Sequence, residues 1–324
     1  MTTVRSTIFV FLIAAVAASA AVDPILLNLV MPDAKFVSGI QVESSRNSPF
    51  GRYVLSQIEM NDPGFTKFIT TTGFDPRRDL AEVVAGTSGT SADPATLVLG
   101  RGTFSPAVIL AAAKAHGATV STYGAIDIIT VTHPGANTAG GLAFLNASYA
   151  AMGTVDAVKG AIDRYKSPAG TPSVFSSRAQ TLSDNNDAWF LSTGPVTDFF
   201  TGKIADPNLG GALKGNLLQA VLQADGGVKF GDNVTISGQA LTRSDKDAAA
   251  LADVVRFLAG MVQMNSGSDP NAKKLASLLD TLTLSTPGAT MQLSLSIPES
   301  TVEQLFMPGG TSGPKARMKR AALR

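Results

Sequence analysis

The sequence predicts an α+β protein with two similar domains, each an antiparallel sheet covered on one face by helices. Short alternating segments separated by Gly, Pro and Asn turns indicate hairpins, whose strands must be antiparallel. Amphipathic helical segments fall between these hairpins and indicate a helical layer packed on each sheet. Both halves of the chain follow a similar order of strands and helices, so we expect a structural duplication, with coincidence as the alternative.

The first domain is expected at residues 36–166, after a lead-in at residues 21–35 that two prolines interrupt. Alternating or compact apolar patterns predict its strands, which are Phe36–Glu43, Leu80–Thr87, Thr96–Gly100, Ala118–Tyr123, Ile126–Thr132, Gly141–Leu145 and Tyr149–Met152. Capping residues and apolar periodicity predict its helices, which begin at Ser48-Pro49, cover Gly64–Thr72 and Ala107–His116, and run from Thr154 to Lys166.

The segment Gly73–Gly86 is expected to carry the chain from a helix into the sheet. Gly73 permits a left-handed helix cap, and Asp75-Pro76 is typical of a turn. Phe74 is expected to fill the space under the helix end. The polar residues that follow are expected to stay solvated, and they are Arg77, Arg78 and Asp79.

Residues 167–187 are rich in Ser, Pro, Gly, Asn and Asp and predict a linker between the domains. The second domain is expected at residues 188–308. Its predicted strands are Ala188–Ser192, Leu217–Ala224, Val228–Leu241 with a break near Gly231-Asp232, Leu282–Ser285 and Met291–Ile297, with a hairpin turn at Asp225-Gly226-Gly227. Its predicted helices are Val196–Lys203, one opened by a Ser244 and Asp247 capping box, Asn271–Leu279, and one from Pro298-Glu299 to Phe306.

The N-terminus predicts a secretory signal at residues 1–20. Arg5 supplies the basic region, Ile8–Ala18 is an unbroken apolar run, and Ala18-Ser19-Ala20 is a small-residue cleavage site. The alternative, an uncleaved anchor, needs about 20 apolar residues, more than this run provides. We therefore expect cleavage after Ala20 and export to the periplasm or beyond. The absence of cysteine excludes disulfides, thiolate metal sites and a lipoprotein anchor.

The charge is unevenly distributed along the chain. Of the 26 basic residues, Arg5 lies in the signal and five lie in the last ten residues, which leaves 20 against 25 acidic residues in the body. A mildly acidic body does not indicate a nucleic-acid-binding protein. Residues 309–324 predict a disordered basic tail. It is either a solvated end or a contact for an anionic envelope surface or envelope protein, through Lys315, Arg317, Lys319 and Arg320.

The segment Gly100–Ser105, GRGTFS, resembles a dinucleotide-binding loop because it lies between a predicted strand and a predicted helix. Ser105 replaces the third glycine, however, and Pro106 removes a helix N-terminal N–H. We therefore interpret it as a strand-to-helix turn with a Ser-Pro cap and expect no cofactor.

The remaining candidates for chemistry are scattered. His116 and His133 have no partner at metal-ligand spacing, so no metal site or histidine-based catalysis is predicted. Solvation explains the acidic groups, which are Asp75 and Asp79, and Asp245, Asp247 and Asp253. Arg77 and Arg78 are candidate anion contacts. The Trp189 ring is expected to pack across the domain seam, with an aromatic ligand platform as the alternative.

Three stretches carry a resemblance that covers most of the chain after the signal. They are Pro32-Asp33-Ala34, the GFDPRRDL turn at residues 73–80, and AFLNASYAAMGTVDAVKGAIDRY at residues 143–165. In these stretches the chain resembles uncharacterised exported bacterial proteins, which have no established activity, so the resemblance carries no function over to this chain.

Three functions follow as hypotheses. The first is an exported cell-envelope protein that acts as a non-enzymatic binding or structural module. The second is a carrier that holds an apolar ligand between sheet and helices. The third is a hydrolase whose carboxylates converge only in the fold.

Overall fold

The computed structural model describes residues 21–52, 63–89, 94–131, 139–168, 173–195, 219–264, 276 and 278–306. The strands are β1 (Phe36–Gln41), β2 (Leu80–Gly89), β3 (Pro94–Gly102), β4 (Thr119–Tyr123), β5 (Ile126–Val131), β6 (Gly140–Phe144), β7 (Tyr149–Thr154), β8 (Ala188–Ser192), β9 (Val221–Lys229), β10 (Asn233–Thr242), β11 (Thr283–Ser285) and β12 (Thr290–Pro298). The helices are α1 (Pro24–Leu29), α2 (Val42–Asn47), α4 (Pro63–Thr72), α5 (Pro76–Asp79), α6 (Pro106–Ala115), α7 (Val155–Lys166), α8 (Ser173–Asn185), α12 (Asp245–Met264) and α14 (Glu299–Phe306).

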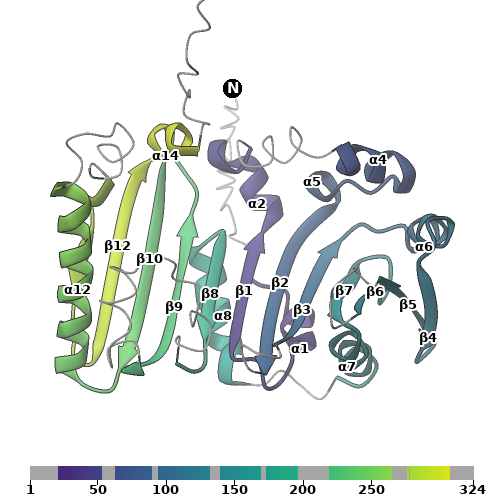
Figure 1. Cartoon of the computed structure of the whole chain (residues 1–324), viewed down its shortest axis with the longest axis horizontal. Helices are drawn as coiled ribbons and strands as arrows, with labels where there is room; N and C mark the ends of the chain where they lie inside the picture. The colour runs from purple at the N-terminus through teal and green to yellow at the C-terminus, as the bar shows by residue number, and fades with distance from the viewer. Residues whose placement is uncertain are drawn as a thin grey trace, which may run out of the picture.

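The strands form one 12-stranded sheet in the order β11-β12-β10-β9-β8-β1-β2-β3-β7-β6-β5-β4. Every pairing between neighbouring strands is antiparallel, which confirms the predicted α+β class and its antiparallel sheet. Figure 1 shows α12 lying along one end of this sheet, while β7, β6, β5 and β4 curl at the other end.

The expectation of a separate sheet in each half is wrong, because β1 joins the halves. β1 pairs with β2 on one side and with β8 on the other, so Gly39 lies opposite both Val84 and Trp189. The glycine makes room for the indole ring, since a Cβ on Gly39 would lie 2.6 Å from ring atoms of Trp189. The strand orders of the two halves are similar on either side of this seam, and the duplication itself stays a prediction.

Helices cover both faces of the sheet, and not one face as predicted. The main core packs α1, α7 and α8 against residues such as Val84, Leu99 and Leu191. Leu191 lies opposite Asp225 in the register, so the preceding residue Ala224 points to the other face. Ala224 belongs to the core under α12, and α12 therefore lies on the face opposite α8.

The segment predicted as a linker, residues 167–187, contains the helix α8. Its buried side chains include Ala179 and Leu182, which pack into the main core, while Arg178 forms an ion pair with Asp225 on β9. Polar residues occupy exposed positions of this helix, such as Ser177, Gln180 and Asp184. The division into domains at this segment stays a prediction.

The hairpin turn predicted at Asp225-Gly226-Gly227 is also wrong, because these residues lie inside β9. The glycines are required there by close packing and not by a turn. A Cβ on Gly226 would lie 2.4 Å from the Ser237 carbonyl oxygen, and one on Gly227 would lie 2.3 Å from the Asn186 side chain. The chain reverses at residues 230–232 instead, where the sequence indicated a break.

Most other predicted elements are confirmed, with shifts of a few residues at their ends. The first strand ends at Gln41, where α2 begins, a helix that the sequence analysis did not predict. Ser244 caps α12 as predicted, with its hydroxyl accepting a 3.2 Å hydrogen bond from the Asp247 N–H, while the Asp247 carboxylate accepts a 2.9 Å hydrogen bond from that hydroxyl. Within the described residues, no helix combines the length and hydrophobicity needed to cross a bilayer.

Several predictions lie outside the described residues. They are the signal at residues 1–20, His133, the helix Val196–Lys203, most of the helix Asn271–Leu279, and the basic tail.

Candidate functional site

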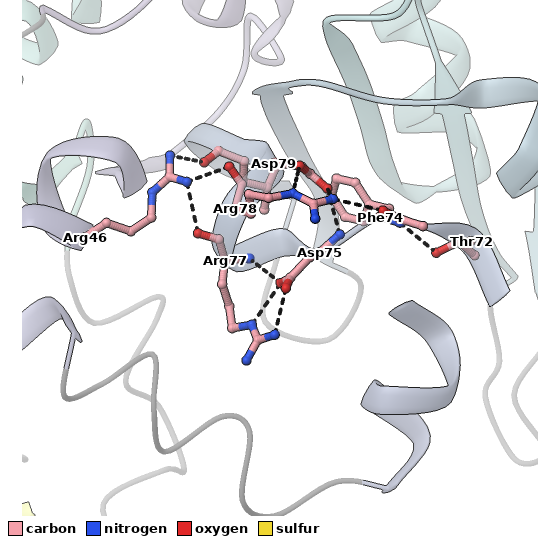
Figure 2. A network of polar contacts seen from close by, with 9 residues as sticks. Arg46, Thr72, Phe74, Asp75, Arg77, Arg78 and Asp79 are labelled. Atoms are coloured by element: carbon pink, nitrogen blue, oxygen red, sulfur yellow. Dashed lines mark hydrogen bonds and ion pairs between the residues drawn. The ribbon is translucent and has the colours of Figure 1, made fainter. Parts of the chain in front are cut away.

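The GFDPRRDL segment connects α4 to β2 through the short helix α5 (Figure 2). Gly73 ends α4 with a φ of +70°, which confirms the predicted left-handed cap. The Asp75 carboxylate caps α5 by accepting a hydrogen bond of 3.0 Å from the Arg77 N–H. The Phe74 ring packs against Phe68 and Phe104, as expected of a residue that fills the space under the helix end.

Both arginines of this segment are paired with neighbouring carboxylates (Figure 2). Arg77 donates two hydrogen bonds to Asp75, at 2.8 and 2.6 Å, and Arg78 donates two to Asp79, at 2.7 and 2.8 Å. The bonds from Arg78 hold the pKa of Asp79 below its ordinary value. The expectation that all three polar residues are solvated is wrong, since only Arg78 is exposed. Anion binding by these arginines stays a prediction.

Arg46 of α2 fixes this segment against the neighbouring helix. Its guanidinium donates hydrogen bonds to the carbonyl oxygens of Arg77, Arg78 and Leu80, so one side chain binds three backbone acceptors of this segment. Figure 2 shows the Arg46 side chain reaching across to the turn. At the other end of the segment, Arg78 donates a 3.0 Å hydrogen bond to the Gly73 carbonyl oxygen. Charged hydrogen bonds therefore hold both ends of the segment, which is an architectural role.

Trp189 is buried in the main core, with 3% of its surface exposed. Its ring packs where β8 meets β1, across the seam between the halves, as the sequence analysis expected. The four tail residues proposed as interaction contacts lie outside the described residues, namely Lys315, Arg317, Lys319 and Arg320.

A buried polar cluster that the sequence analysis missed lies between α1 and the strands β2, β3 and β7. Glu82 is 1% exposed, and it accepts hydrogen bonds from the Asp23 N–H, Gln41 and Arg101. Arg101 also pairs with Asp23, whose carboxylate accepts a 2.9 Å hydrogen bond from the Tyr149 hydroxyl. The sequence contained one signal for this cluster, namely an acidic residue, Glu82, at a position where the alternation of β2 places a buried side chain.

Burial raises the pKa of Glu82 above its ordinary value. Burial, and next the hydrogen bond to Asp23, raise the pKa of Tyr149 to about 12. The two carboxylates, Asp23 and Glu82, both pair with Arg101 and are therefore a counterpart to the converging acids that a hydrolase requires. Their oxygens are already engaged by Arg101, by Tyr149 and by backbone N–H groups, so they hold α1 onto the sheet.

The other acidic candidates have ordinary surroundings. Asp247 belongs to the α12 cap, and Asp253 forms an exposed ion pair with Arg256 one turn away on the same helix. Within the described ranges, no three His, Asp or Glu side chains gather as metal ligands would.

A groove lies on the sheet face opposite α1 and α7, bounded by α4 and α6, and we call it the apolar groove. It consists of two adjoining cavities of about 310 and 360 Å³, which share Phe68, Ile109 and Leu142. We call them the inner cavity and the outer cavity.

The inner cavity is lined by apolar side chains from the sheet, from α4 and α6 and from the GFDPRRDL segment. A row of aromatic rings runs along it, with centroid distances of 6.2 Å from Phe68 to Phe74, 5.3 Å from Phe74 to Phe104, and 5.4 Å from Phe104 to Phe144. The remaining lining residues are Pro76, Leu80, Val83, Val98, Gly100, Ile109, Leu142, Ala150 and Met152.

The outer cavity lies where α4 packs on α6. Its walls are mainly apolar, and its lining residues are Lys67, Phe68, Thr71, Thr72, Ile109, Ala112, Ala113, His116, Ile129 and Leu142.

Alternation along the strands explains why the groove exists. Leu97 and Leu99 of β3 point into the main core, so Val98 and Gly100 point into the groove. An antiparallel sheet can leave one face to water, but its exposed face is then polar. Here the second face is apolar as well, and Met152 remains 52% exposed on it.

The GRGTFS segment contributes to this groove and forms no phosphate-binding loop. Gly100, Arg101 and Gly102 lie within β3, and α6 begins at Pro106, one residue before the predicted start at Ala107. Ser105 makes no capping hydrogen bond with its side chain. Gly100 and Phe104 line the inner cavity instead, so the glycine leaves space in the groove.

Comparison with known protein families and with curated proteins gives no match. Among solved structures the chain is similar to crystal form I of TP0453, with a TM-score of 0.50 and 12% identity, covering 89% of this chain and 97% of that chain. Crystal forms III and IV of TP0453 match at TM-scores of 0.47 and 0.48, each at 10% identity. The match to crystal form I shows a shared fold.

Proposed function

We propose that this chain is an exported cell-envelope protein that binds an apolar ligand in the apolar groove and has no catalytic role. The predicted signal and the resemblance to exported bacterial proteins support the location. The lining of the inner cavity supports the ligand class, because aromatic and aliphatic side chains form it throughout.

The observation that carries the proposal is the exposed apolar face of the sheet. Leaving Phe68 and Met152 at 41% and 52% exposure is unfavourable in water, and a bound apolar group removes that surface from water. Burial of one methylene contributes about 0.8 kcal/mol, so a chain of about ten methylenes gains about 8 kcal/mol before the costs of association. We therefore expect micromolar or weaker binding of a simple chain.

Titration with 1-aminoanthracene, an uncharged fluorescent apolar probe, tests the proposal. Met152→Trp replaces a flexible side chain with a bulky ring that fills part of the groove, so it should lower probe affinity about tenfold. Because Met152 is exposed, the substitution should not unfold the protein. Val108→Trp is the matched control, because Val108 is an exposed apolar residue of α6 that lines neither cavity.

The proposal predicts saturable binding that Met152→Trp weakens and Val108→Trp leaves unchanged. Absence of saturable binding by the wild-type protein would contradict it and favour a structural module. Equal loss in both variants would place the probe outside the groove.

A further inference from the structure

The ionisable side chains among the described residues that line the apolar groove are all basic. Of the described residues that line its two cavities, only Lys67 and His116 have ionisable side chains, and none is a carboxylate. Both belong to the outer cavity, whereas the described residues that line the inner cavity include none with an ionisable side chain. The groove therefore has an apolar end and a basic end.

Lys67 is exposed on α4, and among the described residues it has no acidic partner. Its ammonium group is thus available to a charged ligand atom at the rim. Most cations near the groove are different in this respect, since Arg77 and Arg78 are paired with Asp75 and Asp79.

His116 lies directly after the last turn of α6. Its Nδ1 lies 2.9 Å from the Ala112 carbonyl oxygen, which assigns the N–H to that nitrogen and leaves Nε2 for other contacts. The carbonyl end of α6 disfavours an anion, so Lys67 provides most of the attraction and His116 supplies a second polar contact.

We infer that the apolar groove takes an amphiphile, with one alkyl chain in the inner cavity and an anionic head group, carboxylate or phosphate, at Lys67 and His116. This inference rests on the proposed function. Exposed charge pairs are weak, so the head group should contribute about a fivefold preference over an uncharged one. The alkyl chain supplies most of the affinity, and the basic end fixes its orientation.

Competition against 1-aminoanthracene tests the inference with three ligands of the same chain length: dodecanoate, dodecyl phosphate and dodecanol. The wild-type protein should bind both anions about fivefold more tightly than the alcohol. The double variant Lys67→Gln, His116→Gln should bind all three alike. Lys114→Gln is the control, because Lys114 lies on α6 but lines neither cavity, and it should keep the preference.

The outcomes separate this inference from the proposed function. Equal displacement by the anions and the alcohol, or a preference that survives in the double variant, overturns the inference while the groove still binds chains. A preference for only one anion identifies the head group as carboxylate or phosphate. Failure of all three ligands to displace a bound probe also overturns the inference, and failure of the probe itself to bind overturns the proposed function.

Discussion

The aromatic row of the apolar groove should respond unequally to truncation of Phe104, inside the row, and of Phe68, at one end of it. Phe104 is 7% exposed and contacts two other rings, Phe74 and Phe144, whereas Phe68 is 41% exposed and contacts Phe74 at its edge. Phe104 therefore belongs to the packed wall of the groove, and Phe68 belongs to its mouth.

The expected losses follow from these burials. Removing a well-buried phenylalanine side chain costs about 3–5 kcal/mol, which we expect for Phe104→Ala. Full burial of such a side chain is worth about 1.5–3 kcal/mol, so the partly exposed Phe68 should lose about 1–2 kcal/mol in Phe68→Ala. The two variants should thus differ by about 2 kcal/mol in the free energy of unfolding.

Urea denaturation of the wild-type protein and both variants measures this difference. The exposed Phe257 of α12 gives a control variant, Phe257→Ala, which should lose least of the three. If Phe104→Ala and Phe68→Ala lose equal stability, the assignment of wall and mouth is incorrect.

Four further predictions concern the rest of the chain. Because burial raises the pKa of Glu82, the folded protein binds the Glu82 carboxyl proton more tightly than the unfolded chain, so the free energy of unfolding should fall as pH rises from 4.5 through the raised pKa. Glu82→Gln should flatten this pH dependence in urea titrations, and an unchanged pH dependence refutes the assignment. Gly39→Ala should cost about 1–3 kcal/mol through its clash with Trp189, and unaltered denaturant unfolding would show that the ring moves aside. Val255→Asp should lower the melting temperature strongly, because Val255 packs on the core under α12, and an unshifted melt would place this face in solvent. Mass spectrometry of exported protein should find an N-terminus at Ala21, and an intact N-terminus would contradict cleavage.

Local patterns were sufficient to predict most strands and helix starts. Alternation predicted β4, β5, β6 and β7, and the Ser244 cap predicted the start of α12. Composition misled where tertiary packing decides the structure. Gly226 and Gly227 indicated a turn, but close approach of Ser237 and Asn186 requires them inside a strand.

The groove could not be predicted from local patterns because its walls are distant in the sequence. Phe68, Phe104 and Met152 come from α4, the segment before α6, and β7. Only the pairing of β2, β3, β7 and β6 brings them to one sheet face. The sequence signal was indirect, namely strands such as TLVLG, in which consecutive apolar residues, Leu97, Val98 and Leu99, give both faces an apolar side chain.

Methyl NMR of the methionines tests ligand binding in the groove most directly. The chain has nine methionines, of which Met152 lines the inner cavity and Met264 lies 76% exposed on α12. The ring of 1-aminoanthracene should shift the Met152 methyl resonance saturably and leave the Met264 resonance in place, with Met152→Leu giving the assignment. A titration in which the Met152 resonance does not move, or in which Met264 moves with it, would contradict binding in the apolar groove.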